Sequence, residues 1–156
     1  MRRLVRRLFP PAVELPPDLR RAVALAYPTL DLGAVRFHLG RPHIFLLVYT
    51  EGVTLPAGLF GWPCRSRIYI DPPCWRPETA AGIGLVLHEA FHALQMQETG
   101  RGLGMLHPFI VLYLAAGAAN RFRYAGHPLE TVAYEVAGDE DGRFERLAAR
   151  CGEEVT

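Results

Sequence analysis

The sequence has no lysine and no excess of either charge. All 17 basic residues are arginine, and 16 acidic residues leave a formal net charge of +1 over 156 residues. Proteins that bind nucleic acid electrostatically show a strong basic excess. The charge balance therefore gives no support to a nucleic-acid partner, and codon usage explains the missing lysine better than chemistry does.

Cysteine is scarce, with only Cys64, Cys74 and Cys151. Three are too few for a disulfide framework, and no CxxC pair suggests a cysteine-based metal site. Between Cys64 and Cys74 the segment RSRIYID has strand character and would carry the chain roughly 20 Å away, too far for three more residues to return it to bonding distance. We predict free thiols in a reducing compartment, and therefore a cytoplasmic protein.

The N-terminus lacks the apolar run of about 7 to 15 residues that export requires. It begins MRRLVRRLF, and Pro10 and Pro11 then interrupt it. As an amphipathic helix this start could attach weakly to an anionic membrane, but an arm packed on its own domain is favoured.

Residues 102–119 contain no charged residue over the length of a minimal membrane span. His107 and Pro108 interrupt this segment, and arginines bracket it closely. We therefore expect a buried core helix that starts at Pro108 rather than a span.

The length of the chain and its glycine- and proline-containing breaks predict one α+β domain over residues 1–156, with a proline- and arginine-rich lead-in over 1–17. No internal repeat or low-complexity linker divides the chain. Helix, then strands, then helices is the order typical of the α+β class. The predicted elements are a helix over 18–27, strands over 34–39, 44–50 and 66–71, and helices over about 79–98, 108–123 and 128–149.

The helix over 79–98 carries LVLHEAFHALQ, in which His88 and His92 are one turn apart. At about 100° per residue, Glu89 lies on the same side as both histidines. The opposite side is a continuous apolar stripe formed by Ile83, Val86, Leu87, Ala90, Phe91 and Leu94. One face of this helix is thus predicted to be buried in the core and the other to carry chemistry.

This HExxH spacing is typical of a zinc site, because two neutral imidazoles one turn apart reach one ion at about 2.0 to 2.1 Å. Glu89 is then near the ion but not bound to it. A carboxylate there can accept a proton from metal-bound water, which generates hydroxide for attack on a carbonyl. Two alternatives remain, namely histidines satisfied by hydrogen bonds without a metal, and a zinc site that is only structural.

A third ligand must come from another segment, and the predicted helix from Pro128 offers Glu130 and Glu135. Both lie about 110° from the centre of an apolar stripe formed by Leu129, Val132, Ala133, Val136 and Ala137. A carboxylate at Glu130 is also favoured simply by the helix dipole, and Glu135 could be a solvated acid. Periodicity alone leaves both open.

The stretch from LGAVRFHLG through SRIYID, LVLHEAFHALQ and HPLETVAY resembles a bacterial family of zincin-like metallopeptidases, which includes the core domain of extracellular contractile injection system proteins. The resemblance covers about residues 30–137. His88, Glu89, His92 and Gln95 match its HExxH-xx-Q motif, and Pro128, Glu130 and Ala133 match a weaker P-x-E-x-x-A motif. The resemblance implies a minimal zincin-like domain in which Glu130 is the third ligand, with Glu135 in reserve.

Hydrolysis would also need a polar group that stabilises the oxyanion and a place to bind the substrate. We select Tyr113 for the oxyanion, because it lies on the helix between the two motifs. The other candidates are His107, Tyr124, His127 and Tyr134. For substrate binding, we expect SRIYID to be an exposed edge strand that pairs with a peptide backbone.

The sequence supports two functional classes. The first is a zinc-dependent peptidase of the Glu-zincin type, acting on a peptide or protein, with His88, His92 and Glu130 on the metal and Glu89 as general base. The second is a non-catalytic zincin-fold binding or assembly module with a structural or vestigial metal, because 156 residues leave little room for a deep substrate cleft. A membrane-surface role is a third, less favoured interpretation.

Overall fold

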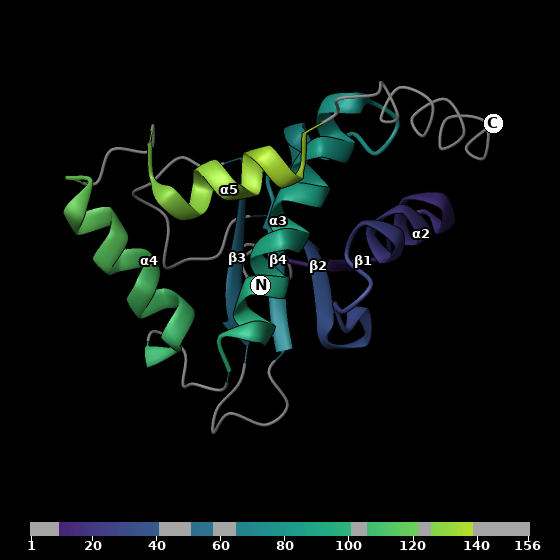
Figure 1. The fold of residues 1–156 in the computed structure, drawn as a ribbon. Coiled ribbons are helices and arrows are strands. Elements are labelled where there is room, and N and C mark those ends of the chain that lie inside the picture. The colour runs from purple at the N-terminus through teal and green to yellow at the C-terminus, as the bar shows by residue number, and fades with distance from the viewer. Residues whose placement is uncertain (1–9, 41–50, 58–64, 101–105, 122–125, 139–156) are drawn as a thin grey trace, which may run out of the picture.

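The computed structural model describes residues 10–40, 51–57, 65–100, 106–121 and 126–138. Within these residues, the chain forms a mixed sheet of four strands and four α-helices (Figure 1). The strands are β1 (Ala12–Val13), β2 (Val35–Leu39), β3 (Gly52–Ala57) and β4 (Arg65–Ile70). The helices are α2 (Pro17–Ala26), α3 (Ala80–Glu98), α4 (Pro108–Ala119) and α5 (Pro128–Val136). The predicted α+β class is therefore confirmed. Within the described residues, none of these helices has the length and apolarity needed to cross a bilayer.

The sheet has the order β1-β2-β4-β3, which places β4 inside it and β3 at one edge. β4 pairs parallel with β2 along Val35–Leu39 and antiparallel with β3 along Gly52–Ala57. The expectation that SRIYID is an exposed edge strand is therefore wrong, because this segment is β4 and has a hydrogen-bonded neighbour on each side. Strand order depends on pairing between distant segments, which the pattern of one strand does not reveal.

The main core lies where α3 covers the sheet and α2 packs beside it (Figure 1). The predicted stripe on α3 is largely confirmed, since Phe91 alone among its members is half-buried. Tyr27, at the end of α2, donates a hydrogen bond from its hydroxyl to the carbonyl of Leu87 at 3.0 Å. This contact ties α2 to the helix that carries the HExxH motif. The buried core side chains of these elements include Leu19, Val23, Ile68, Ile70, Ile83, Val86, Leu87, Ala90 and Leu94.

Periodicity found β2, β4, α2 and α3 to within about a residue but missed β3. The strand has the sequence GVTLPA, and its glycine and proline are depleted in strands. Proline is tolerated here because β3 is an edge strand. The strand predicted over 44–50 lies outside the described residues.

The two C-terminal helices differ from their predictions in length. α4 ends at Ala119 rather than 123, and Arg121 then takes a left-handed backbone conformation with φ of 56°. α5 ends at Val136 rather than 149, since Ala137 and Gly138 are not helical. Residues 139–149 lie outside the described part of the chain.

The expectation that α4 is a buried core helix is also wrong. Its buried residues are Phe109, Ile110 and Gly117, all on one side. Val111 and Leu112 are 51% and 53% exposed. α4 packs through that one side against α3 and α5, as its position at the left of Figure 1 illustrates. A helix can therefore be apolar all round and still have an uncovered face.

Candidate metal centre

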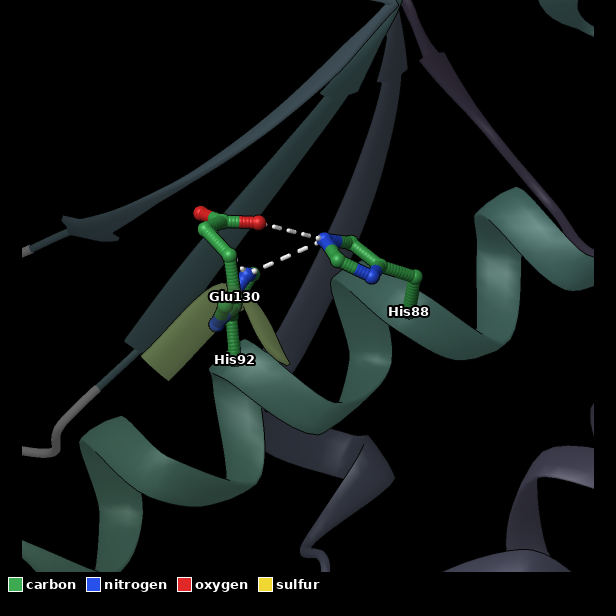
Figure 2. A group of neighbouring side chains, drawn as sticks. All are labelled: His88, His92 and Glu130. Carbon is green, nitrogen blue, oxygen red and sulfur yellow. Dashed lines mark hydrogen bonds and ion pairs between the residues drawn. The ribbon is translucent and has the colours of Figure 1, made fainter. Parts of the chain in front are cut away.

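His88 and His92 project from adjacent turns of α3 and face each other. Their Nε2 atoms are 3.2 Å apart, and both side chains are buried. Burial follows from the fold, because α5 lies against this face of α3. The two rings thus direct their outer nitrogens toward one small region, as the HExxH spacing predicts (Figure 2).

Glu130 of α5 completes a group of three. Its Oε2 lies 3.1 Å from Nε2 of His88, and its Oε1 lies 3.5 Å from Nε2 of His92. Figure 2 shows the carboxylate pointing toward the His88 ring from above α3. One donor atom from each of the three residues falls within 4.8 Å of the others, so this buried group could hold a metal ion. Glu135 is exposed and lies outside it.

The orientation of α5 explains how Glu130 reaches the histidines. The helix begins at Pro128, and Glu130 lies in its first turn. Its buried face follows Glu130 and Ala133, whereas Val132 and Val136 are exposed. The apolar stripe predicted for this segment is therefore only partly its buried face, since Ala133 and Ala137 are buried and Leu129 is half-buried. Ala133, one turn after the carboxylate, is small enough to let α5 lie close to α3.

The electrostatics of the group favour a positive charge next to Glu130. Burial alone would raise the pKa of Glu130, but hydrogen bonds from His88, His92 and Tyr113 hold it well below its usual range. Burial alone would lower the pKa of His92, yet the hydrogen bond to Glu130 and the charges of Glu89 and Glu130 raise it. Glu130 is therefore ionised, and a cation beside it is stabilised.

Gln95 fixes the tautomer of His92. Its Oε1 can only accept, so the 2.8 Å contact with Nδ1 of His92 requires a proton on Nδ1. In the neutral ring, the lone pair of Nε2 then faces His88 and Glu130. Nδ1 of His88 is buried and has no hydrogen-bond partner among the described residues.

Tyr113 of α4 holds the carboxylate of Glu130. Its hydroxyl donates to Oε1 at 2.5 Å, and its ring stacks on His127 at 4.3 Å. The Nε2–H of His127 donates in turn to the carbonyl of Tyr113 at 3.1 Å. Burial and the neighbouring carboxylate both raise the pKa of Tyr113, so the phenol stays protonated and remains a donor.

The three oxyanion candidates that remain after Tyr113 and His127 differ in position. His107 caps α4 by accepting from the amide of Phe109 at 3.2 Å. Tyr134 is exposed, and its ring lies 4.5 Å from that of His88. Tyr124 lies outside the described residues. Tyr113 and Tyr134 therefore adjoin the group, whereas the Nδ1 atom of His107 is engaged in a helix cap.

Glu89 is held by β3, a contact that sequence reasoning missed. The hydroxyl of Thr54 lies 2.6 Å from Oε2 of Glu89 and 3.0 Å from its backbone carbonyl. A Cβ atom on Gly52 would come within 2.6 Å of the other carboxylate oxygen, so only glycine fits there without a shift. Burial raises the pKa of Glu89, although His92 and the Thr54 hydrogen bond oppose this.

Replacement of Thr54 tests this contact. Thr54→Val keeps the shape of the side chain but leaves a buried carboxylate without its hydroxyl donor, which should lower the free energy of unfolding by about 1 to 3 kcal/mol. Thr54→Ser retains the hydroxyl and should stay much closer to the parent protein. Urea unfolding of both variants measures the difference. Equal stability of the valine and serine variants would contradict the interpretation.

Comparison with known proteins identified no relative of this chain. No protein-family model matches the chain, and no curated protein or solved structure matches it. The similarity to zincin-like metallopeptidases therefore stays a prediction from the HExxH and P-x-E-x-x-A residues.

Proposed function

We propose that the chain is a zinc-dependent peptidase of the Glu-zincin type, with His88, His92 and Glu130 as ligands. The observation that carries the proposal is the close approach of the three side chains. The two Nε2 atoms are 3.2 Å apart, and those of His88 and His92 lie 3.1 and 3.5 Å from the two carboxylate oxygens of Glu130. Two ligands bound to zinc at about 2.0 to 2.1 Å with tetrahedral angles lie about 3.3 to 3.4 Å apart. The side chains thus match zinc in spacing and in donor type.

The number of ligands favours a catalytic site over a structural one. Structural zinc sites usually close with four protein ligands, whereas catalytic sites use three and leave one position open. Within the described residues, the group has three members, two imidazoles and one carboxylate. This is the ligand set of the Glu-zincin type.

The roles of the remaining residues follow from their positions. When bound, zinc supplies an activated water and polarises a carbonyl. Glu89 is the general base, and its carboxylate oxygen accepts the proton while Thr54 and Gly52 fix its orientation. Tyr113 keeps Glu130 in place and is the proposed donor to the developing oxyanion.

A peptide substrate would pair with β3. A strand at the edge of a sheet leaves backbone groups available for an added strand, and β3 has that position in the described sheet. β3 also contacts the general base through Gly52 and Thr54. We propose that the domain is zincin-like, because an edge strand lies beside the helix that carries the HExxH motif. A cytoplasmic location stays a prediction from the cysteine content.

One observation favours the second class, a zincin-fold binding or assembly module. Glu89 is 4% exposed, and both of its carboxylate oxygens lie against β3. A general base has to reach the reacting water, so a carboxylate held this tightly also fits a site whose metal only stabilises the fold.

Metal analysis tests the proposal. Protein purified without added zinc should contain about one equivalent of zinc per chain, and zinc should return after removal with a chelator. His88→Ala, purified in parallel, should contain much less. A parent protein that lacks metal and takes up none on dialysis against zinc would overturn both the peptidase and the zinc-module interpretations.

A further inference from the structure

The outward side of α4 is apolar along its whole length. Val111, Leu112 and Leu114 are 51%, 53% and 45% exposed, although large aliphatic residues are usually buried. With three exposed alanines, they spread over about 160° of the helix circumference at about 100° per residue. We call this set the outer face of α4, and its members are Val111, Leu112, Leu114, Ala115, Ala118 and Ala119.

The metal centre does not account for this face. The opposite side of α4 carries Phe109, Ile110 and Tyr113, which contact Met96 of α3 and Glu130 of α5. Polar substitutions on the outer face would leave those contacts intact. Some other function has to explain a contiguous apolar surface that is exposed to water.

The outer face contains no side chain that can form a hydrogen bond. Protein–protein interfaces usually carry about one hydrogen bond per 100 to 200 Å² and have a polar rim. The hydrocarbon of a bilayer requires no such partner, and the helix satisfies its own backbone groups. His107 also caps the first turn of α4 through its side chain. The chemistry of this face therefore fits lipid better than a protein partner.

The charges that flank α4 in the sequence indicate the kind of lipid. The sequence has no acidic residue between Glu98 and Glu130, whereas it has three arginines in that interval. One of them, Arg121, is described and is exposed directly beyond the C-terminal end of α4. Basic residues next to an apolar face are attracted to anionic headgroups.

The length of α4 sets how it can bind. Its 12 residues extend about 18 Å, well short of the about 30 Å of a hydrocarbon core. We propose that α4 docks the protein on an anionic lipid bilayer by lying parallel to the surface with its outer face in the acyl-chain boundary. Binding is peripheral and reversible, and it keeps the metal centre beside the membrane.

Flotation of the full chain with liposomes tests the proposal. The protein should float with vesicles of phosphatidylcholine and phosphatidylglycerol at least about tenfold better than with phosphatidylcholine alone. The double variant Val111→Ser/Leu112→Ser should bind the anionic vesicles about tenfold less, because it removes the two most exposed aliphatic side chains of the face. Arg121→Gln should weaken binding about fivefold.

Two controls separate α4 from other sources of binding. Leu25→Ser makes the same change at a side chain that is 75% exposed on α2, and it should not alter flotation. The quadruple variant Arg2→Gln/Arg3→Gln/Arg6→Gln/Arg7→Gln removes the charge of the N-terminal segment. Loss of binding in the quadruple variant but not in the double α4 variant would overturn the proposal.

The remaining outcomes also decide it. If the parent protein does not float with anionic vesicles at low salt, the proposal fails. If the protein forms a dimer that the α4 double variant dissociates, another chain covers this face and the proposal also fails. If the double variant does not fold, Leu112→Trp gives a second measurement. Its additional fluorescence should be quenched by brominated acyl chains, and an unquenched signal in the presence of anionic vesicles would place α4 away from the bilayer.

Discussion

Glu130→Gln is expected to empty the metal centre at submicromolar free zinc. The substitution keeps the size of the side chain but removes the negative charge that lies 3.1 Å from Nε2 of His88. Two neutral imidazoles then have no anionic partner to offset the charge of the ion. Zinc affinity should fall by several kcal/mol, measured by titration against a competing chelator.

Glu135→Gln and Gln95→Leu are the matched controls. Glu135 is exposed and lies outside the group, so its replacement should cost little zinc affinity. Gln95 orients His92 from 2.8 Å, and loss of such an outer partner typically costs about 10- to 100-fold. A larger loss in Glu135→Gln than in Glu130→Gln would move the third ligand to Glu135.

Glu89→Gln should abolish hydrolysis while the zinc content stays near one equivalent. A positioned general base contributes about 10²- to 10⁴-fold to the rate, and the amide cannot accept the proton. Glu89 is not among the three grouped residues, so metal binding does not require it. Cleavage of an unfolded protein such as casein, with zinc measured in the same samples, would test both halves of the prediction.

The same variant distinguishes the two functional classes. If the parent protein cleaves nothing and Glu89→Gln leaves every measurable property unchanged, while loss of His88 unfolds the chain, the zincin-fold module is the better interpretation. Hydrolysis that persists in both Glu89→Gln and His88→Ala would instead identify a contaminating peptidase.

Local features of the site could be predicted because they depend on spacing within one helix. His88, Glu89 and His92 lie on one face of any helix with about 3.6 residues per turn, whatever packs against it. The start of α3 also depends on a local contact, because the Thr79 side chain caps the helix by accepting a hydrogen bond from the amide of Gly82 at 3.1 Å.

Features that depend on contacts between distant segments could not be predicted. Periodicity left Glu130 and Glu135 equivalent, because it assumed that the apolar stripe of α5 faces the core. The helix instead buries Glu130 and leaves Val132 and Val136 exposed. Thr54 was missed because it contacts Glu89 across a strand pairing that composition does not reveal. The place of β4 inside the sheet has the same cause.

Because the metal centre joins α3 to α5, a bound ion would also act as a cross-link. It would close the chain between His92 and Glu130, including all of α4, which packs on the rest through one side only. Closing a long loop removes conformational freedom from the unfolded chain. Ligands that bind only the folded state add stability according to their concentration and affinity. Zinc supply would thus set how firmly α4 and α5 stay attached to α3, independently of any catalysis.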